Sequence, residues 1–261
     1  MKDAKQKKPR PTAEPAAAGD RPPVLRRPSP TWISGTSVHA SLASEIGLRI
    51  VRGDYPPGTI LPNEQQWSQT FEVSRSAVRE AIKMLMAKSL LASRPKVGSW
   101  VEPRERWNLL DRDVLNWYSS LPNREPFLKT VQEFRYIIEP EATALAAKRR
   151  TSEQMEEITK ACVEMGTART LPERTQADTR FHLAILRASG NELLVPLGVL
   201  IESALDQLFV FVTREANDLR HAQSLHEDIE KCIRLQRPDA ARRAVRRLLA
   251  NTDEIVESVT K

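Results

Sequence analysis

The chain has 261 residues and a formal net charge of +6, with 40% apolar but only 5% aromatic residues. This composition favours helices over a many-stranded sheet. No stretch approaches the roughly 18 consecutive apolar residues of a membrane helix, and no signal peptide is evident, so we expect a cytoplasmic protein with no membrane contact.

The charge is unevenly distributed along the chain. Residues 1–30 hold eight Lys and Arg against three Asp and Glu, residues 31–103 hold eight against six, and the remainder holds twenty-four against twenty-five. The basic excess is therefore N-terminal, as expected where one end of a protein meets a polyanion. Residues 1–30 also contain seven of the eighteen prolines, so we interpret them as a disordered arm, with non-specific attraction to DNA as a secondary possibility.

Residues 31–103 have the pattern of a winged helix-turn-helix domain. Apolar positions three and four residues apart predict a helix over Ser37–Arg52, and Asn63 begins a short second helix through Phe71 with a capping box to Gln66. Ser74 caps the next helix. Two short strands, Leu90–Ser93 and Ser99–Val101, then form a basic hairpin that fits a wing.

The third of these helices carries the candidate DNA contacts. Arg75 and Arg79 lie one turn apart near its N-terminus, the end that reaches into a major groove, and Ser74 and Ser76 can donate to phosphate. A solvated, salt-bridged surface helix is the alternative interpretation. The turn, the caps and the wing around the helix favour DNA binding.

Beyond Arg104 the sequence predicts a connector over residues 104–123 and an all-helical domain over residues 124–261. This bundle is large enough to enclose a pocket. The expected helices are Asp111–Ser119, Arg124–Arg150 with a break near Pro140, Ser152–Ala168, Pro172–Ala188, Glu192–Arg214, Asn217–Leu235 and Pro238–Val259.

Several of these segments resemble a known family of regulators. The runs GDYPPGTILPNEQQW and VSRSAVREAIKMLMAKSLL resemble the winged-helix domain of the GntR superfamily, and FRYIIEPEATALAA, ADTRFHLAILRASGN and LHEDIEKCI resemble the FCD effector-binding domain of its FadR branch. The connector WNLLDRDVLNWY is similar to that of regulators of sugar-acid catabolism, such as galactonate repressors.

The resemblance implies positions for the DNA contacts. In one respect the sequence departs from the family: Gln65 stands where some FadR-branch members place an arginine on DNA, so their operator preference does not transfer. The implied contacts in the recognition helix and the wing are Ser74, Arg75, Ala77, Arg79, Lys96 and Gly98.

A metal site is the second implied feature. Asp178 and His182 are four residues apart on one helical face, a spacing that suits one divalent ion but also occurs in ordinary surface pairs. The resemblance implies that Asp178, His182 and His226 match three of four ligands for an ion such as Zn, Ni or Mn. Leu248 stands where the fourth, a histidine, is usual, so the site either has three protein ligands or is lost.

Arg135 lies in an otherwise apolar helical stretch, and a buried guanidinium needs an anionic partner. Pairing with Glu139 is one interpretation. The resemblance implies the other, in which Arg135 binds the carboxylate of an effector. Cys162 and Cys232 lie on helical stripes and are expected in the core rather than as redox sensors, and Asn191 is expected to cap a helix.

We therefore expect a non-enzymatic, homodimeric transcriptional regulator, most simply a repressor. It binds a pseudo-palindromic operator in double-stranded DNA, and a small carboxylate such as a sugar acid, for example galactonate, modulates that binding. The alternative is a metal-dependent hydrolase using Asp178, His182 and His226. No HExxH motif, nucleophile elbow or phosphate-binding glycine loop supports it.

Overall fold

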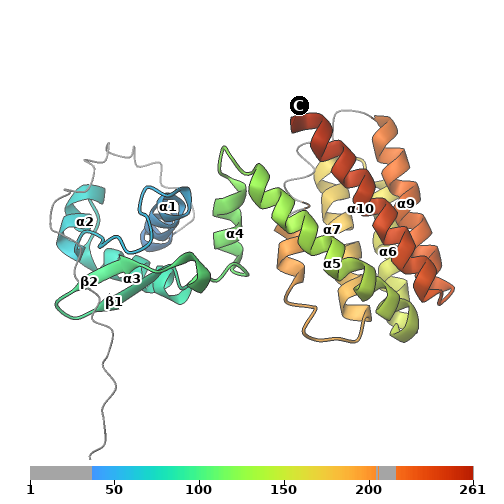
Figure 1. Cartoon of the computed structure of the whole chain (residues 1–261), viewed down its shortest axis with the longest axis horizontal. Helices are drawn as coiled ribbons and strands as arrows, with labels where there is room; N and C mark the ends of the chain where they lie inside the picture. Colours follow the sequence, from blue (N-terminus) through green and yellow to red (C-terminus); the bar gives the residue numbers. More distant parts are fainter. Residues whose placement is uncertain (1–36, 204, 206–215, 261) are drawn as a thin grey trace, which may run out of the picture. The chain divides into compact units, whose positions relative to one another are not determined.

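The computed structural model describes residues 37–203, 205 and 216–260 (Figure 1). The described chain is mainly α-helical with one antiparallel hairpin, which confirms the expected fold class. The basic arm predicted for residues 1–30 lies outside the described residues, as do residues 204 and 206–214 of the helix expected over Glu192–Arg214. Where that segment is described, residues 192–197 form turns and helix begins at residue 198, because Pro196 disfavours helical geometry before it.

Each of the N-terminal helices buries one apolar face against its neighbours. Helix α1 is Val38–Arg52, α2 is Glu64–Phe71 and α3 is Arg75–Ala87. Leu42, Ile46 and Ile50 of α1 are buried, and α3 buries the stripe Val78, Ala81, Ile82 and Leu85 against them. The sequence predicted these faces from the three- and four-residue spacing of their apolar positions.

The turn between α2 and α3 has the expected caps. The capping box between Asn63 and Gln66 is present, and the Ser74 hydroxyl accepts a hydrogen bond from the backbone N–H of Ala77. Glu72 ends α2 in the left-handed region, with φ of 56°. These local interactions fix the angle at which α3 leaves the turn.

The wing is one residue displaced from its predicted bounds. Strand β1 is Leu91–Arg94 and β2 is Gly98–Val101, with Leu91 opposite Val101, whereas the sequence suggested Leu90–Ser93 and Ser99–Val101. Residues 59–61, between α1 and α2, also pair with β2. The Leu61 N–H donates to the Ser99 carbonyl at 2.8 Å, and the Val101 N–H donates to the Thr59 carbonyl at 3.0 Å. This third backbone segment sets the register that the strand pattern alone left open.

A short 3-10 turn, Arg104–Arg106, leads to α4, Arg112–Ser119, which packs on α1. The indole N–H of Trp117 donates to the Ser44 hydroxyl at 3.0 Å, and the Trp117 ring lies against Gly47. The Lys88 ammonium pairs with Asp111 at 2.9 Å, which ties the start of α4 to the end of α3. The connector helix is thus anchored on the winged-helix core.

The C-terminal region is a bundle of antiparallel and crossing helices with a large apolar core and a second, smaller apolar cluster. In Figure 1 α10 lies alongside both α5 and α9, and α6 packs on α7. Phe181, Ile158 and Ile229 are among the fully buried side chains that fill the interior. The helices are α5 (Glu125–Arg149), α6 (Ser152–Thr167), α7 (Leu171–Ala188), α9 (Ala216–Arg234) and α10 (Pro238–Thr260).

The break expected near Pro140 is wrong, because α5 is one continuous helix through that residue. Proline removes one backbone hydrogen bond from a helix interior. Buried positions on both sides of Pro140, Glu139 before it and Ala142 and Thr143 after it, hold the helix in place by packing. Tertiary burial therefore overrides the local preference.

None of the helices in the described ranges is long and apolar enough to cross a membrane.

The contact between Gly47 and Trp117 gives the first prediction. Gly→Ala inside a helix normally stabilises by about 1 kcal/mol, but a Cβ on Gly47 would clash with the Trp117 ring. We expect Gly47→Ala to destabilise the protein by about 1–3 kcal/mol in urea unfolding, because a rigid ring must move. In a Trp117→Ala background the same change should become neutral or stabilising. Equal effects in both backgrounds would contradict the packing of α4 on α1.

Candidate functional site

The N-terminal end of α3 presents its predicted contact residues to solvent. Ser74, Arg75, Ser76 and Arg79 are exposed and Ala77 is half-buried. Within the described ranges Arg75 makes no ion pair, so its guanidinium is the uncompensated cation of this face.

Arg79 differs from Arg75, because it is already paired. Its guanidinium forms a two-pronged ion pair with Glu64, at 2.9 Å from Nε to Oε1 and 2.7 Å from Nη2 to Oε2. The hydrogen bond from Arg79 lowers the pKa of Glu64. Glu64 is the first residue of α2, so this pair connects the two helices of the helix-turn-helix. Sequence spacing did not indicate it, since fifteen residues separate the partners.

The wing hairpin carries the remaining predicted contact residues. Lys96 and Gly98 occupy left-handed backbone positions in its turn, with φ of 66° and 97°, and both are exposed. The Arg94 guanidinium lies over the Trp100 ring at 5.6 Å from its centroid. Gly98 fits its position because a residue without Cβ adopts positive φ at little cost.

A second group of polar residues is buried inside the helical domain. Asp178 and His182 come from α7 and His226 from α9, and each is at most 5% exposed. Asp178 Oδ1 lies 3.3 Å from His182 Nε2 and 3.0 Å from His226 Nε2. One ligand atom from each of the three residues lies within 4.8 Å of the others. The structure therefore brings together the three residues that the sequence singled out.

The contacts of the two imidazoles indicate which nitrogens carry protons. His226 Nδ1 lies 2.7 Å from the Ala222 carbonyl oxygen, and His182 Nδ1 lies 2.8 Å from Glu139 Oε2. An acceptor at this distance requires a proton on the nitrogen, so both rings are inferred to carry Nδ1–H. Both Nε2 lone pairs then face the Asp178 carboxylate.

In this arrangement three hydrogen-bond acceptors face one another, the Asp178 carboxylate and the Nε2 atoms of the two histidines. Asp178 Oδ1, His182 Nε2 and His226 Nε2 are buried and none has a hydrogen-bond partner of acceptable geometry, although they lie close to each other. Such a cluster requires a cation, either a proton or a metal ion. Nitrogen and oxygen ligands of a tetrahedral ion are roughly 3.3 Å apart, which the two distances from Asp178 to the histidines approach. The residues present therefore fit a divalent ion.

The surrounding charges favour the ionised carboxylates. Burial alone would raise the pKa of Glu139, but Arg135 and His182 lower it to about 2. Burial likewise opposes ionisation of Asp178, and the two histidines shift its pKa below the usual range. Burial lowers the pKa of His182, while Glu139 and Asp178 raise it to about 9. A metal ion held by the Nε2 atoms would have to displace any proton there, so its binding would weaken as the pH falls.

Arg135 is fully buried and pairs with Glu139 at 2.5 Å from Nε to Oε1, the pairing that the sequence offered as one of two interpretations. Its Nη1 lies 3.4 Å from the Gln132 side-chain oxygen. The sequence did not place Glu139 beside His182, because these residues belong to different helices and no motif links them. Leu248 is buried in the apolar core and supplies no ligand atom.

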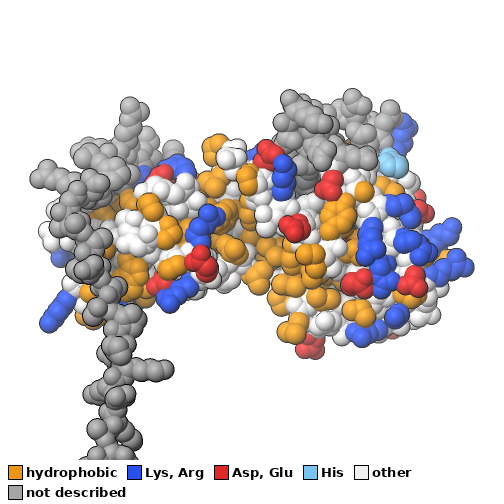
Figure 2. All heavy atoms as spheres, viewed as in Figure 1, with side chains coloured by type: hydrophobic (Ala, Val, Ile, Leu, Met, Phe, Trp, Pro, Cys, Tyr) orange, Lys and Arg blue, Asp and Glu red, His pale blue; other side chains and the backbone are white. Residues whose placement is uncertain are grey.

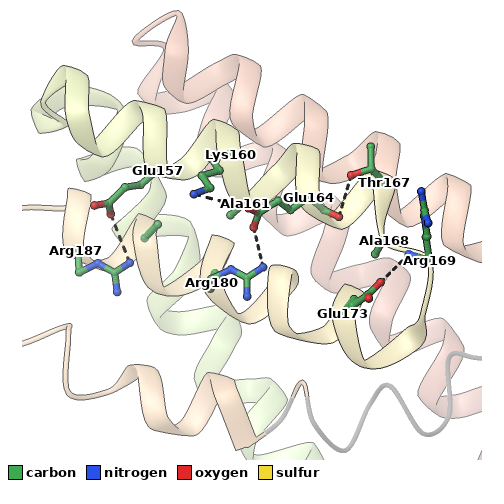
Figure 3. Close-up of a pocket in the computed structure, with 11 residues that line it drawn as sticks. Glu157, Lys160, Ala161, Glu164, Thr167, Ala168, Arg169, Glu173, Arg180 and Arg187 are labelled. Carbon is green, nitrogen blue, oxygen red and sulfur yellow. Dashed lines mark hydrogen bonds and ion pairs between the residues drawn. The ribbon is translucent and has the colours of Figure 1, made fainter.

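The surface of α6 and α7 carries a groove that is separate from the buried Asp178, His182 and His226. It has a volume of about 910 Å³ and contains none of the predicted site residues. Figure 3 shows that its charged side chains pair with one another, Arg180 with Glu164 at 2.8 Å and Arg187 with Glu157 at 3.6 Å. A charged ligand in this groove would have to compete with these internal partners.

A capped helix-turn-helix with a wing, followed by a helical domain that buries Asp178, His182 and His226 together, defines a DNA-binding regulator. The comparisons agree. Residues 39–101 match the bacterial regulatory proteins of the gntR family, and residues 130–251 match the FCD domain. The chain belongs to the GntR family of transcriptional regulators, in the branch with an FCD domain.

Relatives match nearly the whole of their own length. The uncharacterized HTH-type transcriptional regulator YieP of Escherichia coli is 34% identical over 82% of this chain and 93% of the relative. The galactonate operon transcriptional repressor of E. coli is 33% identical over 82% of this chain and 95% of the relative. LutR of Bacillus subtilis, another HTH-type transcriptional regulator, is 29% identical over 79% and 95%.

One solved structure supports the fold. The chain aligns with Lar, which controls the expression of the Listeria monocytogenes agr system and mediates virulence, with a TM-score of 0.60 and 16% identity. The alignment covers 85% of this chain and 98% of Lar.

The cysteines give a prediction about redox chemistry. Cys162 is 4% exposed, and burial raises its pKa to about 12. In a Cys232→Ser variant at pH 8, we expect the remaining thiol to react with an aromatic disulfide reagent at least about 100-fold slower than in the same variant unfolded in guanidinium, because so little thiolate is present. Rapid labelling of the native variant would instead show a thiol fit for redox sensing.

Proposed function

We propose that this protein binds operator DNA as a homodimer and that a small carboxylate metabolite, bound in the helical domain, modulates that binding without being transformed. The observation that carries the proposal is the N-terminal end of α3, where exposed Arg75 has no ion pair with any described residue, on a capped helix within a GntR-family domain. Helix, turn and wing together have the geometry that docks one helix in a major groove.

Each proposed DNA contact has a role that fits its position. Arg75 is placed to reach a base edge or a phosphate. Arg79 either leaves Glu64 to bind a DNA phosphate or stays paired with Glu64 and orients α3. The short side chain of Ala77 permits close approach. Ser74, Ser76 and, in the wing, Lys96 and Gly98 supply hydrogen bonds and charge to the backbone of the duplex.

We assign the sensor to the buried group of the helical domain. Asp178, His182 and His226 would hold one divalent ion such as Zn, Ni or Mn, and three protein ligands leave a coordination position open, since Leu248 contributes none. The bound ion would supply a positive charge for an anionic effector. The Arg135 guanidinium uses its Nε for Glu139 and its Nη1 for Gln132, which leaves Nη2 as the candidate contact for the effector's carboxylate.

A sugar acid is the proposed effector class, and repression is the proposed sign. The support is the similarity to the galactonate operon repressor, together with the connector sequence. For DNA binding to respond, the effector must bind the DNA-competent and incompetent arrangements with different affinities.

The homodimer would give the two-fold symmetry that a pseudo-palindromic operator requires. Figure 2 shows apolar side chains gathered on part of the surface of the helical domain. Ile137 and Leu193, at 64% and 81% exposed, are large apolar residues on that domain's surface. Exposed apolar area of this kind is typical of subunit contacts.

Arg75→Ala tests the DNA-binding assignment. The probe is a duplex selected by the wild-type protein from a randomised pool, and fluorescence anisotropy gives its Kd. We expect Kd to rise by roughly 5- to 150-fold, the effect of losing about 1–3 kcal/mol of base or phosphate contact. Arg243→Ala, which removes the same charge from the exposed face of α10, should leave Kd unchanged. Equal affinities for wild type and Arg75→Ala would refute the assignment.

Thermal unfolding tests the sensor. We expect Zn²⁺ or Ni²⁺ to raise the Tm of the chelator-treated protein and to have no effect on Asp178→Ala, because a ligand that binds only the folded state stabilises it. In the metal-loaded protein, members of a panel of aldonates and uronates should raise Tm further, with lactate as the comparison. A sugar-acid shift that survives chelator but is lost in Arg135→Ala would replace the metal-assisted sensor with a metal-free one.

A further inference from the structure

We infer that Glu139, held in place by Arg135, is a positioning residue that orients His182 as a metal ligand. This inference rests on the proposed metal centre and adds two residues of α5 to it. It gives Arg135 a role in the metal site that does not depend on whether its Nη2 contacts an effector.

The contacts form a chain across two helices. Arg135 Nε lies 2.5 Å from Glu139 Oε1, Glu139 Oε2 lies 2.8 Å from His182 Nδ1, and His182 Nε2 faces Asp178 Oδ1 at 3.3 Å. All four side chains are at most 5% exposed. Glu139 Oε2 has no hydrogen-bond partner of good geometry among the described residues, so the imidazole of His182 is the polar group within its reach.

The division of the carboxylate between two partners argues against a purely structural ion pair. A guanidinium and a carboxylate that only stabilise each other commonly meet through two parallel hydrogen bonds, as Arg79 and Glu64 do on the surface. Arg135 instead engages one oxygen of Glu139 through Nε and leaves the other oxygen beside His182. The carboxylate is thus placed to serve the imidazole.

The two histidines are oriented by different means, and this difference makes the role testable. His226 Nδ1 meets the backbone carbonyl of Ala222, one turn earlier on its own helix. His182 Nδ1 meets a side chain from α5, which a substitution can remove. A carboxylate behind a ligating histidine fixes its tautomer and increases its basicity, and losing such a partner typically lowers metal affinity.

The test measures Zn²⁺ affinity by competition with a chromogenic chelator, using the full-length protein. We expect Glu139→Gln to weaken Zn²⁺ binding by roughly 10- to 100-fold. Because this change leaves the Arg135 charge buried, a second variant, Arg135→Gln with Glu139→Gln, removes both charges and should show the same loss. Arg135→Lys, which keeps a cation beside the carboxylate, should retain most of the affinity.

The matched control is Glu230→Gln. Glu230 is also buried, and it pairs with Arg234, four residues later, and with the Thr159 hydroxyl. None of its described contacts is with the proposed metal ligands Asp178, His182 and His226. Its substitution should lower stability and leave Zn²⁺ affinity unchanged, which separates a loss of ligand orientation from a loss of stability.

A spectroscopic readout identifies the histidine concerned. In the zinc-loaded protein, the ¹⁵N resonance of His182 Nδ1 should shift in the variants that lack the Glu139 carboxylate, while that of His226 Nδ1 stays in place. If wild type binds Zn²⁺ and the folded Glu139 variants bind it within twofold of wild type, the role of Glu139 is overturned and the metal centre stands. If wild type binds no Zn²⁺, the metal centre is overturned and this inference with it.

Discussion

A charge buried in a protein interior must have a partner, and the helical domain buries several in one place. The carboxyl groups of Asp178 and Glu139 contact the same imidazole, and Arg135 is a fully buried cation beside Glu139. Each is costly alone and stable only as part of the group. Helices α5, α7 and α9 must therefore keep a fixed relative position, because each supplies a member of the cluster.

The need to pair these buried charges also explains why α5 continues through Pro140. The proline follows Glu139 directly, so a break there would move the carboxylate away from both Arg135 and His182. The Thr143 hydroxyl donates to the Glu139 carbonyl at 2.7 Å and adds a local restraint on the same turn. The continuity of the helix and the geometry of the ligand group support each other.

The DNA-binding region depends on local rather than buried interactions. Caps at Asn63 and Ser74 fix the helix-turn-helix angle, and the Arg79–Glu64 pair spans the two helices at the surface. Surface ion pairs contribute little to stability, typically about 0–1 kcal/mol, so this pair can exchange for phosphate at small cost. The helical domain by contrast buries its charged groups and holds them against one another. The connector helix α4 is anchored on α1 through Trp117, so a change that moves α4 acts directly on the winged-helix core.

The amino-acid sequence determined the features that have a short period or a local motif. Apolar spacing gave most helices to within about two residues, the caps were found at Asn63 and Ser74, and Asp178 and His182 were recognisable as a pair four residues apart. The family resemblance added His226 and the expected role of the recognition helix, and the comparisons bear out the family.

Tertiary structure alone decided the rest, because the interactions concerned join residues that no local pattern connects. Glu64 reaches Arg79 across a turn, Glu139 reaches His182 from another helix, and the register of the wing depends on backbone bonds from residues 59 and 61. Pro140 by itself favours a break in the helix, yet the burial of side chains on both sides of it outweighs that preference. Local preference thus specified the elements, and the need to pair buried charges specified how the helical elements meet.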